Sequence, residues 1–360
     1  MRQGLASVLR DPDLLSKLAP VELDRMLRLL RRARLLGRVA VQLEEGAGLE
    51  VLPGQAADQL SSARVMAEAR ARVGRWELDR LAWALEDLSD TPLIAMKGCA
   101  YLLVGTPNAR GRMFADVDLL VPESRLPLIE EKLLARGWRL AELTPYDDLY
   151  YRRWTHELPP MTHVERSVEV DLHHGILMRT ARLKPSSDLL FEAAREVPGS
   201  RFMVLAPVDM VLHAIVHLFY GGEMAGALRE LLDIDELLRH FGATEPDFWG
   251  QFWPRVESLD LARPAFYGLR YAMTILGTPI PAFVVRASGV GAPAGPVLAL
   301  MDWLVPRVLF PGPLDGRGSV IGVAHGLAYV RSHWVKMPPG TLIRHLAYKF
   351  YVRNMRPSGA

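Results

Sequence analysis

Apolar residues recur at helical spacing through the first quarter of the chain. In segments 12–45 and 55–89, Leu, Val and Met alternate with many arginines, and Gly and Pro residues within 46–54 separate the two segments. A repeat near 3.6 residues with one apolar side is typical of amphipathic helices. The apolar side of the second helix is expected to carry Trp76, Leu78, Leu81, Trp83 and Leu85. We therefore predict that residues 1–90 form an N-terminal helical segment.

After residue 90 the helical repeat of apolar residues gives way to short apolar runs. LIAM (93–96) predicts a short buried strand, and KGCAYLLVG (97–105) predicts a turn that enters a helix ending at a glycine. A polar loop at 106–113 precedes a second buried strand, ADVDLLV (115–121). A helix is then expected over 123–137, with a glycine at its end.

Further strands are expected in the second half of this region. WRLAEL (138–143) and DLYYRRWTH (148–156) could both be strands, and SVEVDLHH (167–174) alternates most regularly of all. From about residue 205, long apolar repeats return. The predicted fold class is α+β: a small mixed sheet at 91–204, flanked by the N-terminal helical segment and a C-terminal helical domain at 205–360.

Two carboxylates interrupt the apolar run at 115–121. Successive strand residues point to opposite faces, so Asp116 and Asp118 share one face of their strand. The same rule places Glu169, Asp171 and His173 on one face of the strand at 167–174, and Val168, Val170 and Leu172 on the inward face. If these two strands are neighbours, the three aspartates could converge at one end of the sheet.

Clustered carboxylates repel one another, and an unpaired buried charge costs several kcal/mol. A divalent cation such as Mg²⁺ removes this cost, because it prefers hard oxygen ligands and also binds substrate phosphates. A plainer interpretation is open as well. An Asp-x-Asp pair in a strand can be exposed at a sheet edge, or can pair with arginines, and Arg110 and Arg112 lie close in sequence.

Composition restricts the class of protein. The 360 residues are 50% apolar and 23% charged with a formal charge of +2, which is typical of a globular protein and not of a uniformly basic nucleic-acid binder. A single cysteine, Cys99, excludes a disulfide within the chain. The N-terminal residues lack the apolar core of a signal peptide, and no apolar stretch predicts a membrane span. We expect a cytoplasmic protein.

Three motifs in order carry a resemblance to a known family. MKG (96–98), RMFADVDLLV (112–121) and VEVDLHH (168–174) resemble an uncharacterised bacterial nucleotidyltransferase family of the DNA polymerase beta-like nucleotidyltransferase superfamily. The resemblance covers about residues 90–240. It implies transfer of a nucleoside monophosphate from an NTP, such as ATP, to a hydroxyl acceptor, with Mg²⁺ or Mn²⁺ as cofactor and release of pyrophosphate.

The resemblance also implies roles for individual residues. Asp116, Asp118 and Asp171 would be the catalytic carboxylates and the metal ligands, and Asp171 would also assist deprotonation of the acceptor. The nucleotide would be bound by Lys97, Gly98, Arg112 and His173. The superfamily usually has Ser or Gly after the turn glycine, whereas Cys99 follows Gly98 here. A nucleotide-binding or regulatory module that has lost catalysis is therefore an alternative.

Other polar residues have simpler explanations. His213 and His217 share a helix face and could bind zinc, but the Glu of a zinc-protease motif is absent, so a structural or pocket-lining role is favoured. Arg229, Asp233 and Glu236 also share a face, and an ion pair within the helix is the favoured interpretation.

The C-terminal segment 329–357 mixes basic and aromatic residues. Such a segment could contact RNA or an anionic surface, which leaves an RNA-modifying, toxin-like nucleotidyltransferase as a further alternative. The simpler explanation is a packed amphipathic helix. The sequence does not identify the acceptor, which could be a small molecule, a protein or an RNA.

Overall fold

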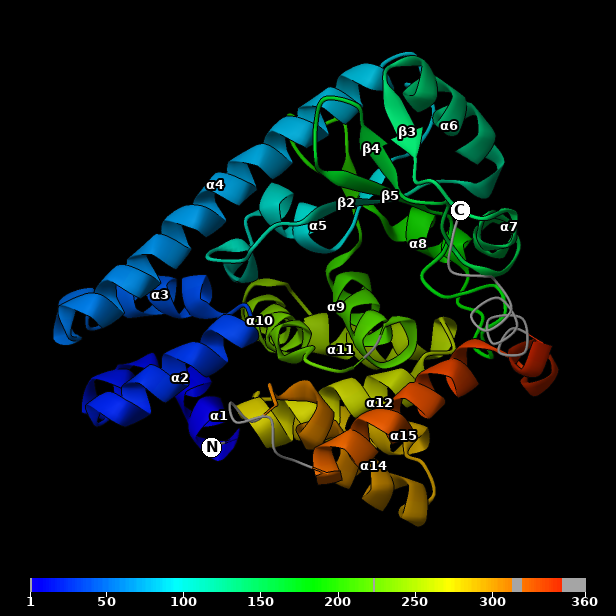
Figure 1. The fold of residues 1–360 in the computed structure, drawn as a ribbon. Helices are drawn as coiled ribbons and strands as arrows, with labels where there is room; N and C mark the ends of the chain where they lie inside the picture. The colour runs from blue at the N-terminus through cyan, green and yellow to red at the C-terminus, as the bar shows by residue number, and fades with distance from the viewer. Residues whose placement is uncertain (1, 223, 313–318, 345–360) are drawn as a thin grey trace, which may run out of the picture.

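A computed structural model describes residues 2–222, 224–312 and 319–344 and confirms the α+β class (Figure 1). The helices are α1 Arg2–Arg10, α2 Pro20–Arg32, α3 Leu36–Glu45, α4 Gly54–Ala84, α5 Lys97–Val104, α6 Leu126–Ala135, α7 Pro145–Trp154, α8 Ser187–Ala193, α9 Pro207–Val216, α10 Leu228–Thr244, α11 Phe248–Ser258, α12 Ala262–Tyr271, α13 Ala282–Ser288, α14 Gly295–Leu309 and α15 Ser319–Lys336. The strands are β1 Ile94–Ala95, β2 Asp116–Leu120, β3 Trp138–Leu140, β4 Met161–His163, β5 Glu169–His173, β6 Arg195–Glu196 and β7 Met203–Val204.

The strands form one mixed sheet in the order β3-β4-β5-β2-β1-β7-β6. β2 pairs with β5 in parallel, and β1 pairs with β7 in parallel, whereas the other neighbours are antiparallel. In the register of β2 and β5, Asp116 lies opposite Glu169 and Asp118 lies opposite Asp171. The expectation that the two acidic strands are neighbours is thus confirmed.

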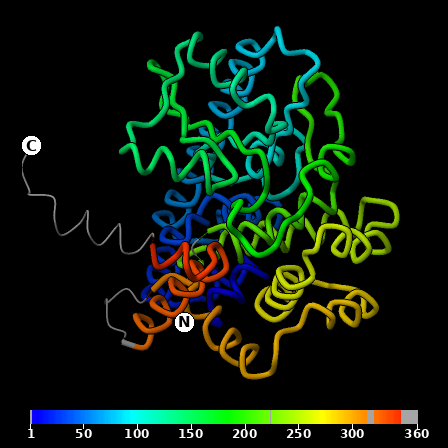
Figure 2. The backbone as a smooth tube through the Cα atoms, turned by 90° about the vertical axis from the view of Figure 1, so that its right-hand side faces the viewer, coloured from blue at the N-terminus to red at the C-terminus, as the bar shows by residue number. Residues whose placement is uncertain are grey.

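Two apolar cores flank the sheet. One contains Val117, Leu119 and Val170 and packs under the C-terminal part of α4 and under α6. The other joins α1–α3 and the helices after residue 205, and it includes Leu120 of the sheet. Because strand residues alternate, the face of β2 that carries Asp116, Asp118 and Leu120 is turned toward the C-terminal helices. Figures 1 and 2 show the sheet in the upper half of the molecule, with the C-terminal helices below it.

The N-terminal prediction needs two corrections. The segment 12–45 is not one helix: a 3₁₀ turn at Pro12–Lys17 precedes α2 and α3, which are separate. On α4, Leu78 and Leu81 are buried as expected, but Trp76 and Trp83 are 49% and 45% exposed. Their rings instead lie beneath arginine guanidinium groups, since Arg136 stacks over Trp83 at 4.0 Å. Such cation–π contacts stabilise an aromatic ring without burying it.

The predicted strand at 148–156 is also wrong, because residues 145–154 form the helix α7. Thr144 caps its first turn by accepting a hydrogen bond from the Asp147 amide at 3.2 Å, and Pro145 follows at the first helical position. Both features favour a helix start. β3 at 138–140 and β5 at 169–173 are confirmed, whereas β4, β6 and β7 were not predicted. The domain boundaries at 90/91 and 204/205 remain predictions.

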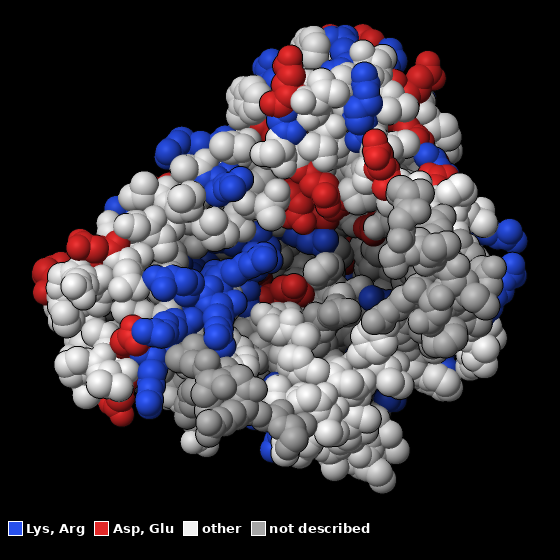
Figure 3. All heavy atoms as spheres, in the orientation of Figure 1, with Lys and Arg blue, Asp and Glu red and all other residues white. Residues whose placement is uncertain are grey.

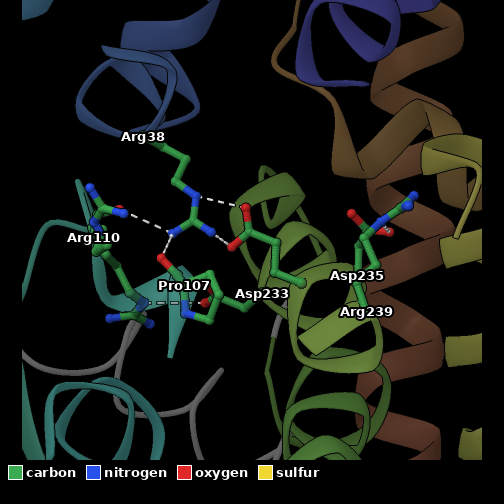
Figure 4. A network of polar contacts seen from close by, with 8 residues as sticks. Arg38, Pro107, Arg110, Asp233, Asp235 and Arg239 are labelled. Atoms are coloured by element: carbon green, nitrogen blue, oxygen red, sulfur yellow. Dashed lines mark hydrogen bonds and ion pairs between the residues drawn. The ribbon is translucent and has the colours of Figure 1, made fainter. Parts of the chain in front are cut away.

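A buried arginine joins three parts of the chain (Figure 4). Arg38 of α3 is 5% exposed. Its Nε donates to Glu236 of α10 at 2.7 Å, and its Nη1 donates to the carbonyl oxygens of Pro107 and Arg110 at 2.8 and 3.0 Å. One guanidinium group therefore connects the N-terminal helix α3, the loop before β2 and the C-terminal helix α10.

No single helix in the described ranges is long and apolar enough to cross a membrane. One sharply bent pair, Ala282–Gly291 with Gly295–Leu309, satisfies that condition only when the two helices are taken together, by length and composition.

Candidate active site

Asp118 is the best-buried carboxylate of the predicted site. It is 1% exposed in the middle of β2, and one of its oxygens, Oδ1, contacts Lys97 Nζ at 2.7 Å and His173 Nε2 at 3.0 Å. Burial alone would raise the pKa of Asp118, but the charge of Lys97 and the hydrogen bond with His173 hold that pKa well below its usual range. Asp118 is thus an ionised acceptor in the folded protein.

Asp171 lies beside Asp118 but does not contact a basic side chain of its own in the described ranges. Within the described ranges its carboxylate has no hydrogen-bond or ion-pair partner. Burial, followed by repulsion from Asp118 and Glu157, raises the pKa of Asp171 to about 8. Ligand atoms of Asp118, Asp171 and His173 lie within 4.8 Å of one another. The two close carboxylates form a hard oxygen site that a divalent cation would relieve, so the residues fit Mg²⁺ or Mn²⁺.

Asp116 starts β2 on the same face as Asp118 and is more exposed. It does not belong to the group of ligand atoms within 4.8 Å, although its charge acts on both Lys97 and Arg112. The alternative in which nearby arginines neutralise the two aspartates is not what the structure shows. Arg110 pairs with Glu45, and Arg112 donates from Nε to Asp233 of α10 at 3.2 Å.

The turn from β1 into α5 supplies the basic side of the site. Lys97 has a φ of 46°, a left-handed conformation that costs free energy for a residue other than glycine and that directs its side chain to Asp118. Gly98 follows, and a Cβ placed there would lie 2.7 Å from Arg112 Nη1. The glycine therefore leaves room for the Arg112 guanidinium group directly beside the start of α5.

Cys99 is structural in this arrangement. Its thiol is fully buried and contacts the Asp116 carbonyl oxygen at 3.6 Å. Burial raises the pKa of Cys99 well above its ordinary value, so the thiol stays protonated. It therefore contacts the backbone at the start of β2 as a buried, neutral side chain.

The two histidines of α9 have separate environments. His213 is 4% exposed and lies near Lys97 and His173, where burial lowers its pKa well below the ordinary value. His217 contacts Glu230 through Nδ1 at 3.1 Å. In the described part of the chain, neither belongs to a group of three metal-ligating side chains. His213 is thus a buried neutral residue near Lys97 and His173, and its structural or pocket-lining role remains a prediction.

The ion pair expected within α10 is wrong. Asp233 and Glu236 instead pair across elements, with Arg112 and Arg38. Arg229 has no ion-pair partner among the described residues, and its side chain is half-buried. Burial lowers its pKa, and repulsion from Arg112 adds to this. Arg229 is therefore a cation without a direct ion pair among the described residues, although the charges of Asp233 and Glu230 act on it.

A cavity of about 770 Å³ opens next to Asp116. Met113, Phe114 and Ala115, which precede β2, form one wall, and α4 contributes Met66 and Arg70. The end of α2 and the turn after it add Arg31 and Arg34, of which Arg34 also acts electrostatically on Arg229. Figure 3 shows basic side chains gathered in this hollow beside a group of acidic ones.

His156 and Glu157 also belong to the surroundings of the site, and the sequence analysis did not identify them. They lie between α7 and β4, where the chain pairs with the end of β5 through a bridge between Glu157 and His173. This pairing joins residues distant in sequence, so no local pattern indicates it.

The motif order can now be compared with known families. Residues 19–277 match a family described as an uncharacterised nucleotidyltransferase, which is well over half of the chain. The chain belongs to this family. The match reaches beyond the predicted resemblance on both sides. It includes α2–α4 before the sheet and continues through α12 after it. No curated protein and no solved structure matches the chain.

The C-terminal prediction is tested only in part. Residues 345–357 of the basic-aromatic segment lie outside the described residues. In α15, Arg331 donates to the Phe219 carbonyl oxygen at 2.8 Å and lies over Tyr220 and Tyr267, so this basic side chain packs inward. Trp334 is 47% exposed, with Arg182 over its ring.

Proposed function

We propose that the protein transfers a nucleoside monophosphate from an NTP to a hydroxyl acceptor with the help of Mg²⁺ or Mn²⁺. The observation that carries this proposal is the pair Asp118 and Asp171, a buried and a half-buried carboxylate at the same level of adjacent strands. In the reaction, the acceptor oxygen bonds to the α-phosphorus, the bond to pyrophosphate breaks, and the acceptor proton leaves.

Each carboxylate has a proposed role. Asp116, Asp118 and Asp171 would hold the metal, which supplies charge neutralisation for the phosphates and for the attacking oxygen. Asp171, whose carboxylate is not paired, would receive the acceptor proton once a bound cation has offset its repulsion from Asp118. Lys97 and His173 fix the carboxylate of Asp118, so that its free oxygen keeps one orientation. Such positioning supplies much of the rate in phosphoryl chemistry.

The donor side is proposed to use the start of α5 and the neighbouring cations. Lys97, Gly98 and Arg112 would contact the phosphates, as the family motif implies. Lys97 and Arg112 already have carboxylate partners, whereas Arg229 has none among the described residues. We therefore add Arg229 to the proposed phosphate site, because an anion bound there would offset its repulsion from Arg112.

The experiment incubates the protein, Mg²⁺ or Mn²⁺ and each α-labelled NTP with an extract of the source cells. Wild-type protein should move label onto one acceptor fraction. Asp118→Ala removes several kcal/mol of stabilisation in the transition state, so transfer should fall at least about a hundredfold. Asp24→Ala, at an exposed acid of α2, is the matched control and should leave transfer unchanged.

Two results would count against the proposal. Undiminished transfer by Asp118→Ala would exclude the metal assignment. If wild-type protein binds NTP but moves no label with any extract fraction, the alternative of a nucleotide-binding module without catalysis is favoured. The buried position of Cys99 in place of a phosphate-binding serine is the feature that would explain such a result.

A further inference from the structure

His156, Glu157 and His173 bring three electron-pair donors together on the side of His173 away from Asp118. One ligand atom from each lies within 4.8 Å of the others. The bridge between Glu157 and His173 fixes two of them, and the backbone amide of His174 donates to the His156 carbonyl oxygen at 2.8 Å. The group is therefore held by backbone pairing at the end of β5 and not by a mobile loop.

The hydrogen bond from His173 to Asp118 leaves the other ring nitrogen of His173 without a hydrogen-bond partner. Asp118 is an ionised acceptor, so Nε2 of His173 must donate to it across 3.0 Å. A neutral imidazole then has a lone pair at Nδ1. That buried Nδ1 has no hydrogen-bond partner, although Glu157 Oε2, itself an acceptor, lies 3.3 Å away. A buried acceptor that faces a second, half-buried acceptor is unfavourable unless a proton or a cation lies between them.

His156 adds a second unsatisfied nitrogen. Its Nδ1 is buried without a hydrogen-bond partner, and its ring centre lies 5.3 Å from that of His173. Burial, with repulsion from His173 and Lys97, lowers the pKa of His156 well below its ordinary value. His156 is therefore a neutral imidazole at physiological pH, the form in which histidine binds a metal.

We propose that His156, Glu157 and His173 form a second metal site, which binds a divalent transition-metal ion of the zinc class. Two imidazoles and one carboxylate are typical ligands of such ions, whereas Mg²⁺ prefers oxygen ligands only. Ligand atoms around zinc lie roughly 3.4 Å apart in tetrahedral geometry. Side-chain rotations that move the ligand atoms by about an ångström would bring them to that spacing. A water or a substrate atom would complete the coordination.

The site would also act on the carboxylates next to it. Metal at Nδ1 fixes His173 in the tautomer that donates from Nε2 to Asp118. The ion would thus orient Asp118 through one histidine, without touching the proposed phosphate site. This inference does not depend on the transfer reaction, because metal binding is measured without nucleotide.

The test titrates the metal-free full-length protein with Co²⁺ and follows its visible absorption, which reports nitrogen ligation and low coordination number. Wild-type protein should bind one ion with this signal. His156→Ala and the nearly isosteric Glu157→Gln should each weaken binding at least tenfold. His240→Ala, at a histidine of α10 outside the group, and Asp116→Ala should change the affinity less than twofold. Zn²⁺ should displace the Co²⁺, and Mg²⁺ should not.

A second measurement separates binding from folding. Saturating Zn²⁺ should raise the melting temperature of wild-type protein and of His240→Ala, but not that of His156→Ala or Glu157→Gln. The proposal is overturned if wild-type protein gives no Co²⁺ signal, or if the signal survives both substitutions. The first result would assign the group to a doubly protonated His173 that bridges Asp118 and Glu157, and the second would assign the Co²⁺ to the neighbouring group Asp118, Asp171 and His173.

Discussion

Replacing Arg38 with methionine tests how the layers are joined. The side chain is buried, and its removal takes the guanidinium donors away from the Glu236 carboxylate and from the carbonyl oxygens of Pro107 and Arg110. Burial lowers the pKa of Arg38 to about 10 even though the nearby Asp233 raises it. The guanidinium group is thus still charged at neutral pH, and the contacts are charge-assisted.

The expected cost follows from the loss of one partner of a buried ion pair. Breaking such a pair costs about 3–5 kcal/mol, because the remaining charge is buried without compensation. A folded protein is stable by only about 5–15 kcal/mol. At about 2 °C per kcal/mol for a chain of this size, the melting temperature of Arg38→Met should fall by about 6–10 °C.

The assay is thermal melting followed by circular dichroism, with Arg28→Met as the matched control. Arg28 pairs with Asp24 on the surface of α2, where the two side chains are 60% and 56% exposed. Such a pair contributes at most about 1 kcal/mol, so the control should melt within about 2 °C of wild type. If Arg38→Met also melts within that range, the contacts of the buried guanidinium do not hold the layers together.

Three further substitutions test separate parts of the account. Gly98→Ala would place a Cβ 2.7 Å from Arg112 Nη1, so NTP affinity should fall while the melting temperature changes little; unaltered affinity would contradict the role of this close approach. Gly137→Ala puts a side chain at a φ of 99° and 2.7 Å from His163 Nε2, which should cost about 1–3 kcal/mol in denaturant unfolding. The pKa of His213 in the folded protein lies well below its ordinary value. Below about pH 6.5 the unfolded state therefore binds more protons than the folded state. The free energy of unfolding should fall as the pH drops through that value. His213→Gln should flatten this dependence, and an unchanged profile would show that another group causes it.

The sequence predicted the acidic strands well because their signal is local. A period of two places Asp116 and Asp118 on one face and Asp171 and His173 on another, and the parallel register of β2 and β5 brings these faces together. The α+β class and the nucleotidyltransferase family followed from the same motifs. Whether Asp116 binds metal with Asp118 and Asp171 is still a prediction.

What the sequence did not predict depends on contacts between distant segments. The pairing of Asp233 with Arg112 leaves Arg229 without a carboxylate partner among the described residues, yet spacing along α10 indicated a pair within the helix. His156 and Glu157 reach the site through a single bridge to β5. The error at α7 was avoidable, because Thr144 and Pro145 are a recognisable helix start.

The central claim is the type of bond that is broken, and one paired measurement tests it. Wild-type protein, Mg²⁺ and the acceptor fraction are incubated with ATP labelled on either the α- or the γ-phosphate, or with whichever NTP transfers best. The account predicts that α-label moves to the acceptor while γ-label leaves as pyrophosphate. Transfer of γ-label to the acceptor would mean phosphoryl transfer and would contradict the account.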